Sequence, residues 1–351
     1  MTEKELKSIA ENFEMEGIVL SVLPLGNGLI NDTYIVRTAG HDTDYVLQRI
    51  NNSIFKNVDL LQHNVMTVTT HIRKKLASQG VTDLDRRVLR FITTRDGNSY
   101  YIDMSGRFWR MSVFIAGAHT YDAVTPEYAY CAGKAFGNFE AMLVDLDEPL
   151  GETIPDFHNM ELRMSQLREA MAADACGRLS EVRDMIATIE ANAYEMCKAE
   201  RMGREGLLPK RVCHCDTKVN NMMFDDDGNV LCVIDLDTVM PSFVFSDYGD
   251  FLRTASNAVA EDCPDISKVE FRRDIYEAFT KGYLESADSF LTRTERENLP
   301  YAVSLFPFMQ CVRFLTDYIN GDSYYKIKYP THNLDRARNQ LAFFEKVKDL
   351  K

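Results

Sequence analysis

The segment that most constrains the fold runs from His214 to Asn221, reads HCDTKVNN, and contains the pattern H-x-D-x-x-x-x-N. A turn signal at Asp225 to Asn229 follows, and then an apolar strand that ends at Asp235. So short a loop keeps Asp216 and Asn221 on one rim, and the two strands around the turn bring Asp235 back to the same edge. Phosphoryl transfer requires a carboxylate that orients a hydroxyl, and an amide and a second carboxylate that hold magnesium. The segment therefore predicts a kinase-type site.

The bulk composition narrows the class of protein. At 351 residues, with 45% hydrophobic and 26% charged residues, the chain is long enough for one two-lobed domain or two modest domains. A formal net charge of −13 argues against a nucleic-acid partner, which needs a basic face. There is no secretory signal and no apolar stretch long enough to span a bilayer. The eight cysteines form no C-x-x-C pair, which is typical of reduced thiols. We expect a cytoplasmic protein with no membrane partner; nothing in the sequence predicts its oligomeric state.

The run Cys213-His214-Cys215 also raises the question of a zinc site. Adjacent residues seldom all reach one tetrahedral ion, and no second Cys/His pair lies nearby in the sequence. Small thiols packed beside the loop are therefore the favoured interpretation.

The first third of the chain has the alternation of an antiparallel sheet interrupted by one helix. Apolar residues recur at helical steps from Val58 to Leu76, and glycine-containing turns separate the strands. The expected strands are residues 18–24, 33–37, 45–50, 87–94, 99–104 and 108–115.

From Gly117 onward the pattern becomes helical. Thr125-Pro126-Glu127 reads as a helix start, with a capping hydroxyl and proline at the first helical position. Helical patterns cover about 160–202 and 268 to the end, and one strand pair is expected at 222–224 and 230–234. We place the boundary near 115–118, which gives a nucleotide-binding lobe of residues 1–116 and a catalytic and substrate-binding lobe of residues 117–351. The expected class is α+β, with a small antiparallel sheet and a larger, mainly helical lobe.

With these features the chain resembles the aminoglycoside phosphotransferase and choline kinase group, whose members share a two-lobed, protein-kinase-like fold. Within that group it is most similar to bacterial N-acetylhexosamine 1-kinases. The resemblance implies an ATP- and magnesium-dependent kinase that phosphorylates the anomeric hydroxyl of a small amino sugar. The segments that carry it are PLGNGLIN at 24–31, YVLQRIN at 45–51, VIDLDTVMP at 233–241, RFLTDY at 313–318 and HNLDR at 332–336.

The resemblance assigns roles to the loop and the following strand. Asp216 would orient the acceptor hydroxyl or accept its proton, because an alcohol is a weak nucleophile. His214 would brace the loop through hydrogen bonds. Lys218 would face the transferring phosphate, with a solvated surface lysine as the alternative. Asn221 and Asp235 are the expected magnesium ligands, as hard oxygen donors. Asp237 could bind a second magnesium ion or the substrate.

Nucleotide binding is expected in the first lobe. The turn Gly26-Asn27-Gly28 would bring backbone amides to the phosphates, although an ordinary hairpin needs the same glycines. The phosphate-binding lysine usual in this fold is absent, and Gln48 or Arg49 stands in its place. Strand alternation lets only one of them face the cleft, and Gln48 aligns better. For the helix partner that is normally Glu, the candidates are Asp59 and Gln62.

For the sugar, the resemblance implies Arg313, with Asn31, Asp237 and Tyr324 as weaker candidates. Arg313 lies in an apolar helical run, where a buried charge needs a partner, so a structural salt bridge to Asp317 is the competing interpretation. Two further predictions concern residues that would stabilise the catalytic loop and a helix N-terminus. Asp247 or Asp250 would brace the catalytic loop, and Asp156 to Asn159 would cap the next helix.

Two other functions remain open. One keeps the chemistry and changes the acceptor to choline, another amino alcohol or an aminoglycoside. Choline would need an aromatic cage, and the single tryptophan, Trp109, lies in the first lobe. The other is a silent pseudokinase that acts as a binding module, favoured only by the missing lysine. The presence of Asp216, Asn221 and Asp235 argues against it.

Overall fold

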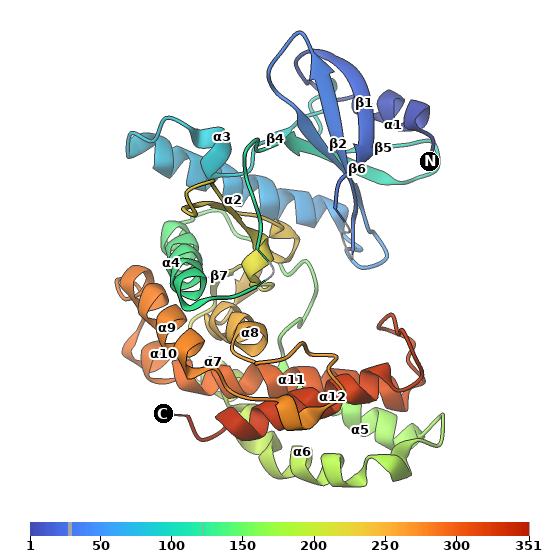
Figure 1. The fold of residues 1–351 in the computed structure, drawn as a ribbon, viewed down its shortest axis with the longest axis vertical. Helices are drawn as coiled ribbons and strands as arrows, with labels where there is room; N and C mark the ends of the chain where they lie inside the picture. The colour runs from blue at the N-terminus through green and yellow to red at the C-terminus, as the bar shows by residue number, and fades with distance from the viewer. Residues whose placement is uncertain (27–29, 122, 351) are drawn as a thin grey trace. The chain divides into compact units, whose positions relative to one another are not determined.

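The computed structural model describes residues 1–26, 30–121 and 123–350, which form two compact units (Figure 1). Unit 1 consists of Met1–Thr120, Asp145–Pro155 and Met222–Met240, and unit 2 of Tyr121–Val144, Asp156–Asn221 and Pro241–Lys351. The N-terminal stretch of unit 1 therefore ends close to the expected boundary at residue 116. Two later stretches, which the sequence placed in the second lobe, group with it.

A six-stranded antiparallel sheet dominates unit 1, in the order β1-β2-β3-β6-β4 with β5 also paired to β6. One face of the sheet packs on α1 (Glu3–Ala10), which begins with a capping box formed by Thr2 and Glu5. Trp109 lies fully buried in this core. The strands are β1 (Ile18–Pro24), β2 (Asp32–Ala39), β3 (Tyr45–Ile50), β4 (Phe91–Ile92), β5 (Tyr101–Ile102) and β6 (Phe108–Val113).

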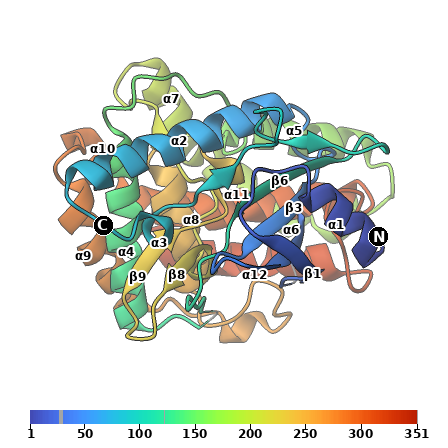
Figure 2. The same ribbon diagram turned by 90° about the horizontal axis from the view of Figure 1, so that it is seen from above.

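The remainder of unit 1 comprises helices α2 (Val58–Ser78) and α3 (Leu84–Arg87) and the hairpin of β8 (Met222–Phe224) and β9 (Val230–Val233). Figure 2 shows α3 beside β9, where Arg87 Nη1 donates to the carbonyl of Val230 at 3.4 Å. The short turn η3 (Leu236–Thr238) follows the hairpin. Asn64 of α2 is fully buried and donates to the carbonyls of Gly151 and Val239, at 2.7 and 2.8 Å. One side chain therefore joins all three stretches of unit 1.

The expected strand at 87–94 is wrong. Its first residue ends the short helix α3, and only Phe91–Ile92 pairs with β6. Local ion pairs explain the difference, since Asp83 binds Arg87 at 3.0 Å and Asp85 binds Arg90 at 3.1 Å. These contacts stabilise a helical turn where β-branched residues had indicated a strand.

Unit 2 is mainly helical, and its helices pack closely where glycines face a neighbouring backbone. A Cβ on Gly133 would lie 2.1 Å from the carbonyl oxygen of Phe279, and one on Gly282 would lie 2.1 Å from that of Tyr130. The helices are α4 (Pro126–Leu143), α5 (Met160–Ala173), α6 (Arg183–Met196), α7 (Lys198–Arg204), α8 (Phe245–Ala255), α9 (Arg273–Ala287), α10 (Arg293–Glu297), α11 (Leu299–Ile319) and α12 (His332–Val347).

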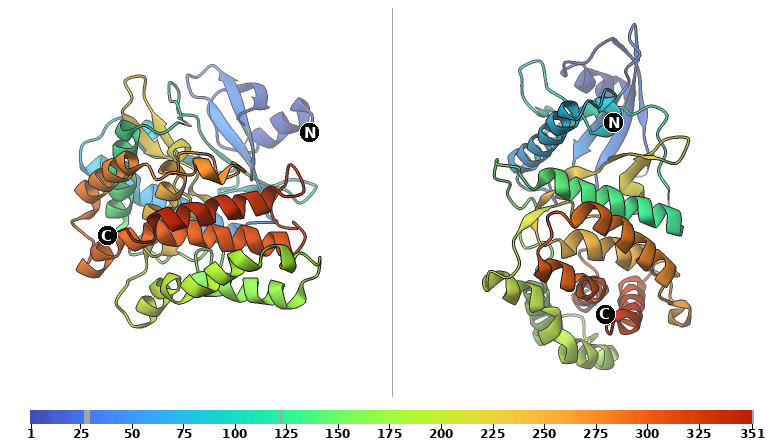
Figure 3. Two further views of the ribbon diagram at one scale, coloured as in Figure 1. Left: turned by 60° about the horizontal axis from the view of Figure 1, so that its bottom comes forward. Right: turned by 90° about the vertical axis from the view of Figure 1, so that its left-hand side faces the viewer.

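The middle of unit 2 is α11, which is buried along most of its length. Figure 3 shows α12 along one side of α11 and α5 along another, and both pairs are in contact. The expected helix start at Thr125 is confirmed, because its side chain accepts the N–H of Tyr128. Two short strands, β7 (Arg211–Cys213) and β10 (Met240–Ser242), pair with each other. Three single turns complete the unit: η1 (Leu179–Glu181), η2 (Val219–Asn221) and η4 (Ile266–Lys268).

The α+β class is therefore confirmed, with an antiparallel sheet near the N-terminus and helices toward the C-terminus. Among the described helices, none has the length and apolar content needed to cross a bilayer.

Candidate active site

The catalytic loop begins where β7 ends, and Asp247 of α8 fixes its backbone. Both carboxylate oxygens of Asp247 accept loop amides, from His214 and from Cys215, each at 2.7 Å. The hydroxyl of Thr217 donates to the Asp247 carbonyl at 2.7 Å. Cys215 has a positive φ of 63°, a left-handed conformation that few non-glycine residues adopt. The predicted bracing role of Asp247 is the one that the structure shows.

His214 is fully buried beneath this loop. Its ring lies edge-on to Phe136 and Phe139 of α4, with centroids 5.6 and 6.0 Å away. Its Nδ1 accepts the backbone N–H of Asp216 at 3.3 Å. A ring held in this way supports the loop and has no access to a reacting hydroxyl, which agrees with the predicted bracing role.

Asp216, Lys218 and Asn221 come together on the rim of the loop. Lys218 Nζ lies 2.6 Å from Asp216 Oδ1, and Asn221 Nδ2 donates to Asp216 Oδ2 at 3.3 Å and to its carbonyl at 2.8 Å. The Asp216 side chain is 25% exposed and that of Lys218 39% exposed. Burial opposes the charge on Lys218, but attraction by Asp216 and Asp250 outweighs it and raises the pKa of Lys218. Lys218 therefore stays a cation beside the Asp216 carboxylate.

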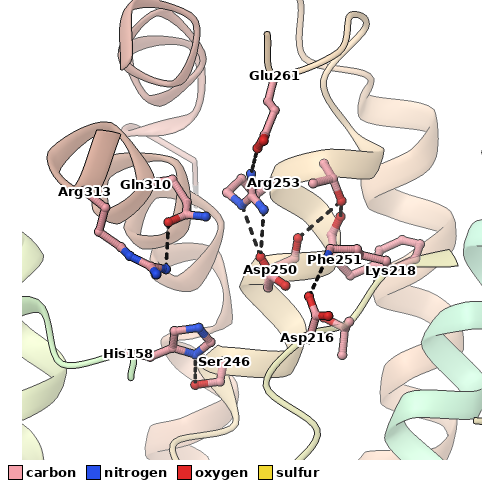
Figure 4. A network of polar contacts seen from close by, with 12 residues as sticks. His158, Asp216, Lys218, Ser246, Asp250, Phe251, Arg253, Glu261, Gln310 and Arg313 are labelled. Carbon is pink, nitrogen blue, oxygen red and sulfur yellow. Dashed lines mark hydrogen bonds and ion pairs between the residues drawn. The ribbon is translucent and has the colours of Figure 1, made fainter. Parts of the chain in front are cut away.

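Charged residues of α8 continue this cluster. Arg253 is buried between Asp250 of its own helix, at 3.1 Å, and Glu261, at 2.7 Å. Figure 4 shows Asp216 and Lys218 pointing toward one another, with Asp250 and Arg253 alongside. Burial raises the pKa of Asp250, and the charge of Asp216 adds to this, while Arg253 opposes it. Each carboxylate of the cluster therefore has a cation nearby: Lys218 for Asp216, and Arg253 for Asp250.

A second buried group lies beneath the loop and bears on the zinc alternative. Among the described residues, one trio of possible metal ligands lies within 4.8 Å: Glu140, Cys213 and Asp247. Both carboxylate oxygens of Asp247 already accept loop amides, and burial raises the pKa of the Cys213 thiol well above its usual range. Tyr283 donates to Glu140 at 2.5 Å. The trio fits a packed, neutral support better than a metal site.

Asp235 occupies the end of the β8–β9 hairpin in unit 1, as the sequence predicts. It is exposed and has φ 59° and ψ 56°, a left-handed conformation that Asp tolerates better than most residues. The next turn, η3, begins immediately after it. The sharp bend separates the exposed carboxylate of Asp235 from Asp237, which is 3% exposed.

Asp237 lies in a buried polar chain across unit 1. Its Oδ1 is 2.5 Å from Arg110 Nη1, and its Oδ2 accepts Asn31 Nδ2 at 2.6 Å. Arg110 Nε donates to Gln48 Oε1 at 3.0 Å, and Asn31 Oδ1 accepts the backbone N–H of Asn51 at 3.0 Å. Both ends of Asn31 and both oxygens of Asp237 therefore contact protein groups. Asp237 was expected to bind a metal ion or the substrate, and Asn31 the substrate. In the structure the two side chains are hydrogen-bonded to each other.

Gln48 and Arg49 point to opposite faces of β3. Gln48 joins the Arg110–Asp237 chain, whereas Arg49 forms a half-exposed ion pair with Asp32 at 2.6 Å. The face of Gln48 is thus the one that carries the polar chain, in line with the preferred alignment. Of the predicted phosphate turn, Gly26 is exposed with φ 68°, and Asn27 and Gly28 lie outside the described residues. Of the helix-partner candidates, Asp59 accepts the hydroxyl of Tyr100 and Gln62 donates to the carbonyl of Ser99.

Arg313 makes no ion pair within the described residues. Its guanidinium lies over Phe157 and Tyr325, 5.3 and 5.8 Å from the ring centroids, and donates to Gln310 Oε1 at 2.9 Å. Asp317 instead accepts the backbone N–H groups of Tyr324 and Tyr325, at 2.8 and 2.9 Å. The salt bridge that competed with a substrate role is therefore wrong. The Tyr324 side chain is 69% exposed, and it is Tyr325 that contacts Arg313.

The donors present suit magnesium and a nucleotide only in part. Asn221 uses its Nδ2 for protein contacts, and no described hydrogen bond uses its Oδ1. That oxygen and the exposed carboxylate of Asp235 are hard donors of the type that magnesium prefers. Asp237 does not fit as a ligand, because Arg110 and Asn31 take its oxygens. Among the described residues, Gly26 and Gln48 are the candidates for contacts with the nucleotide phosphates.

Sequence reasoning missed two functional groups. Arg110, on β6 beside Gln48, supplies the buried cation of unit 1, and Arg253 neutralises Asp250 near the loop. The signal for Arg110 was present, because Arg110 and Ser112 alternate with apolar residues along a buried strand. For Arg253 the spacing of three residues from Asp250 on one helix was the available cue.

Comparisons with known proteins identify the family and the fold. A family model for the phosphotransferase enzyme family matches residues 21–285. Among solved structures, a putative aminoglycoside phosphotransferase from Ralstonia eutropha has a TM-score of 0.60 at 15% identity, covering 99% of this chain and 98% of that one. A microcompartment-associated aminopropanol kinase has a TM-score of 0.59 at 14% identity, covering 98% and 96%. A spectinomycin phosphotransferase with ADP and spectinomycin has a TM-score of 0.55 at 13% identity, covering 98% and 94%. At these identities the structures show a shared fold, the protein-kinase-like one.

Proposed function

We propose that this chain, which belongs to the phosphotransferase enzyme family, uses ATP and magnesium to phosphorylate the anomeric hydroxyl of an N-acetylhexosamine. The coarser function, a phosphotransferase acting on a small molecule, follows from the family. The sugar and the position phosphorylated are the proposal. An aminopropanol kinase and a spectinomycin phosphotransferase share the fold, so the acceptor has to be argued from this chain's own residues.

The observation that carries the reaction type is the contact of Asp216 with Lys218 and Asn221. A carboxylate that is 25% exposed and paired with a lysine at 2.6 Å can accept a hydrogen bond from an alcohol and hold it in line. Lys218 remains protonated, so its charge can offset the negative charge that develops during transfer. Asn221 holds the carboxylate in place through its Nδ2.

Magnesium and the nucleotide would be held by residues on both sides of the hairpin. Asn221 Oδ1 and the carboxylate of Asp235 are the proposed metal ligands, and Gly26 and Gln48 the proposed phosphate contacts, with Asn27 and Gly28. Magnesium, when bound, neutralises part of the triphosphate charge. Asp237 is proposed to position Asn31 and Arg110, since its oxygens already bind them.

The surroundings of Arg313 favour a sugar over a choline-like acceptor. A quaternary ammonium needs open aromatic faces, but Arg313 itself lies over Phe157 and Tyr325. A second cation there would meet a charge of the same sign. Sugar hydroxyls and an acetamido oxygen accept hydrogen bonds from a guanidinium, which suits the geometry. We propose Arg313 as the main sugar contact, with the exposed Tyr324 as a further one.

The direct test measures ATP consumption with magnesium across N-acetylglucosamine, N-acetylgalactosamine, plain hexoses, choline, 1-amino-2-propanol and kanamycin. Phosphorus NMR of the product then locates the phosphate. We expect turnover of an N-acetylhexosamine with an anomeric phosphate. Turnover only of an amine would keep the phosphotransferase and discard the sugar. Hydrolysis or binding of ATP with no acceptor turned over would contradict the sugar kinase proposal.

The role of Asp216 has its own prediction. Asp216→Asn removes the carboxylate and should lower kcat by about 10²–10⁴-fold, because a positioned base is lost. Binding of ATP, measured as a rise in Tm with magnesium and ATP, should stay close to wild type. Asp227→Asn makes the same change at an exposed residue of the β8–β9 turn and serves as the control. Wild-type kcat in Asp216→Asn would refute the assignment.

A further inference from the structure

Two arginines from different helices of unit 2 meet around Phe157. Arg163 of α5 donates its Nη2 to the carbonyl of Phe157 at 2.7 Å, and the guanidinium of Arg313 of α11 lies 5.3 Å from the centroid of the same ring. Figure 4 shows Arg313 with Gln310 on one side and His158 on the other. The side chains of Arg163 and Arg313 thus both contact Phe157, and their charges are close enough to repel one another.

Neither guanidinium has a carboxylate partner within 4.0 Å in the described part of the chain. Arg163 donates only to neutral acceptors: Gln166 Oε1 at 2.9 Å and the carbonyls of Asp156 and Phe157 at 3.0 and 2.7 Å. Three other arginines with little exposed surface differ from this pair. Carboxylates lie 2.5 to 2.7 Å from Arg110, Arg211 and Arg253.

The lack of a counter-charge has an energetic consequence. Burial lowers the pKa of Arg163 to about 10, with the charge of Arg313 contributing in the same direction. Two like charges in a poorly solvated region repel one another, and burying each charge costs free energy unless an opposite charge approaches. In a chain with a net charge of −13, acidic residues are plentiful, yet the nearby Asp156 is exposed and forms no ion pair with either arginine in the described part of the chain. The arrangement is therefore one that an anion would stabilise.

Hydrogen-bond donors are also in excess at this place. Arg163 Nε and Tyr325 Oη are buried atoms that have no hydrogen-bond partner among the described residues. Tyr325 is held in position from its backbone, because its N–H donates to Asp317. The other titratable groups nearby do not supply a buried negative charge. Asp156 is exposed and accepts from Asn159, Glu261 pairs with Arg253, and burial lowers the pKa of His158 far enough to keep it neutral.

We propose that Arg163, Arg313 and Tyr325 form a subsite for an acidic group, a carboxylate, sulfate or phosphate, on the acceptor that is phosphorylated. The inference rests on the proposed function and deepens it: the preferred acceptor is an N-acetylhexosamine that carries an anionic substituent. A planar or tetrahedral oxyanion between the arginines accepts the unused guanidinium N–H groups and the phenol O–H. It also removes the repulsion between the two cations. A neutral sugar can accept hydrogen bonds from these donors, but it leaves the positive charges of the two arginines without a counter-charge.

The test compares kcat/KM for N-acetylglucosamine with that for its 6-sulfate, its 6-phosphate and the corresponding 6-carboxylate, so that the three sources of the charge are distinguished. We expect at least one acidic acceptor to be preferred about tenfold or more, the preference falling with added salt as charge–charge attraction is screened. Equal or better turnover of the neutral sugar, with no salt dependence, overturns the proposal. This comparison uses the unaltered protein and needs no variant to fold.

Variants then locate the subsite. Arg163→Gln should reduce kcat/KM for the acidic acceptor about tenfold more than for the neutral one, and Arg163→Lys should keep part of the preference because it keeps the charge. Arg168→Gln changes an exposed arginine of the same helix, paired with Glu190, and should alter neither value. An equal loss on both acceptors in Arg163→Gln would indicate a structural role and contradict the subsite.

Binding without ATP separates this inference from the proposed function. Calorimetric titration with N-acetylglucosamine 6-sulfate should show binding to the wild type that is about tenfold weaker in Arg163→Gln. Binding without turnover of any sugar would retain the anion subsite and reject the sugar kinase. Turnover of neutral sugars, with no binding preference for the sulfate, would retain the kinase and reject the subsite.

Discussion

Glu140 shows how much a single buried side chain can depend on protonation. It lies under the catalytic loop and is 3% exposed; Tyr283 donates to its Oε2, and its Oε1 has no hydrogen-bond partner among the described residues. Burial raises its pKa well above the ordinary 4.5, and the nearby charge of Asp247 adds to the rise. The two loop amides stabilise a negative charge on Asp247 and oppose the effect of burial on its pKa, so we assign the proton to Glu140. A neutral carboxylic acid therefore supports the loop.

A pH dependence follows, with a definite sign. Above pH 4.5 the unfolded chain loses the Glu140 proton and the folded chain keeps it, so stability falls as pH rises toward the folded-state pKa. Glu140→Gln is neutral at every pH and escapes this loss. Relative to wild type, its free energy of unfolding should rise by up to about 1.4 kcal/mol per pH unit over that range. Urea unfolding of both proteins between pH 5 and 8 measures the difference.

The same substitution at an exposed glutamate calibrates this result. Glu169 lies on the surface of α5, and Glu169→Gln should follow the wild type at every pH. If the difference in free energy of unfolding between Glu140→Gln and wild type also did not change with pH, Glu140 would be ionised in the folded protein. Its role as a neutral support would then be refuted.

The buried pair of Arg110 and Asp237 gives a second prediction at this scale. The side chains are 3% and 4% exposed and 2.5 Å apart, so removing either leaves an uncompensated charge. Asp237→Ala should lower the free energy of unfolding by about 3–5 kcal/mol. The double variant Arg110→Met/Asp237→Leu should recover most of the lost free energy of unfolding, because apolar residues can replace a buried ion pair. A mild loss in Asp237→Ala, no larger than about 1 kcal/mol and typical of exposed pairs, would contradict the buried geometry.

At the scale of elements, the connection between α11 and α12 is held by a network centred on Asp317. Its two oxygens accept three N–H groups, from Tyr324, Tyr325 and Asn333, at 2.8 to 2.9 Å. Asn333 also donates to Asp322 at 2.9 Å, and Arg178 binds Asp322 at 2.6 Å. The connection is thus anchored from both helices and from the segment before α6.

Asp317→Asn replaces an acceptor with a donor at this point. One backbone N–H would lose its partner, at a cost of about 1–3 kcal/mol, and the connection should open locally. Lys326 and Lys328 are exposed there, so trypsin should cleave after them about tenfold or more faster than in wild type. Mass spectrometry of the fragments measures the rate, and Asp288→Asn, at an exposed ion pair, is the control. Cleavage at the wild-type rate would show that Asp317 does not anchor the connection.

The elements that could be predicted are those with strong local signals. The strand at 18–24, the strand at 45–50 and the helix start at Pro126 match the structure because alternation and capping act within a few residues. The short strands β7 and β10, only three residues each, were missed because their pairing joins distant parts of the chain. Helix α8 was missed because its buried face includes polar residues such as Asp247 and Asp250, which blur the helical pattern.

The same reasoning separates the predictable part of the site from the rest. The contact of Asp216 with Asn221 lies within one short loop, and Asp235 lies at the end of a local hairpin, so both features follow from local sequence signals. The contact of Asp237 with Arg110 joins residues more than a hundred positions apart, and no periodicity reveals such a pair. For Arg313 the local signal was misleading. Asp317 lies four residues later on the same helix, a spacing that favours an ion pair, but its carboxylate accepts the backbone N–H groups of Tyr324 and Tyr325 instead.

At the scale of the whole molecule, unit 1 is assembled from three stretches that are far apart in the chain. Residues 1–120 contain the whole six-stranded sheet, but two of their buried polar side chains depend on partners in the later stretches: Arg110 for its counter-charge and Asn64 for its acceptors. Arg110 needs Asp237, and Asn64, which is 0% exposed, needs the carbonyls of Gly151 and Val239. A sheet with intact backbone pairing can therefore still lack the contacts that make it stable.

We therefore expect residues 1–120, expressed alone, not to fold cooperatively. Losing the partner of one buried charge costs about 3–5 kcal/mol, which is comparable to the total stability of about 5–15 kcal/mol of a typical domain. Nuclear magnetic resonance should show poor amide dispersion, and urea unfolding should show no sharp transition. The same fragment with Arg110→Met and Asn64→Leu removes both unmet polar groups and should recover part of the dispersion. A cooperative transition in the unaltered fragment would mean that the later stretches are dispensable for the sheet, and that the polar chain through Arg110 contributes little to its stability.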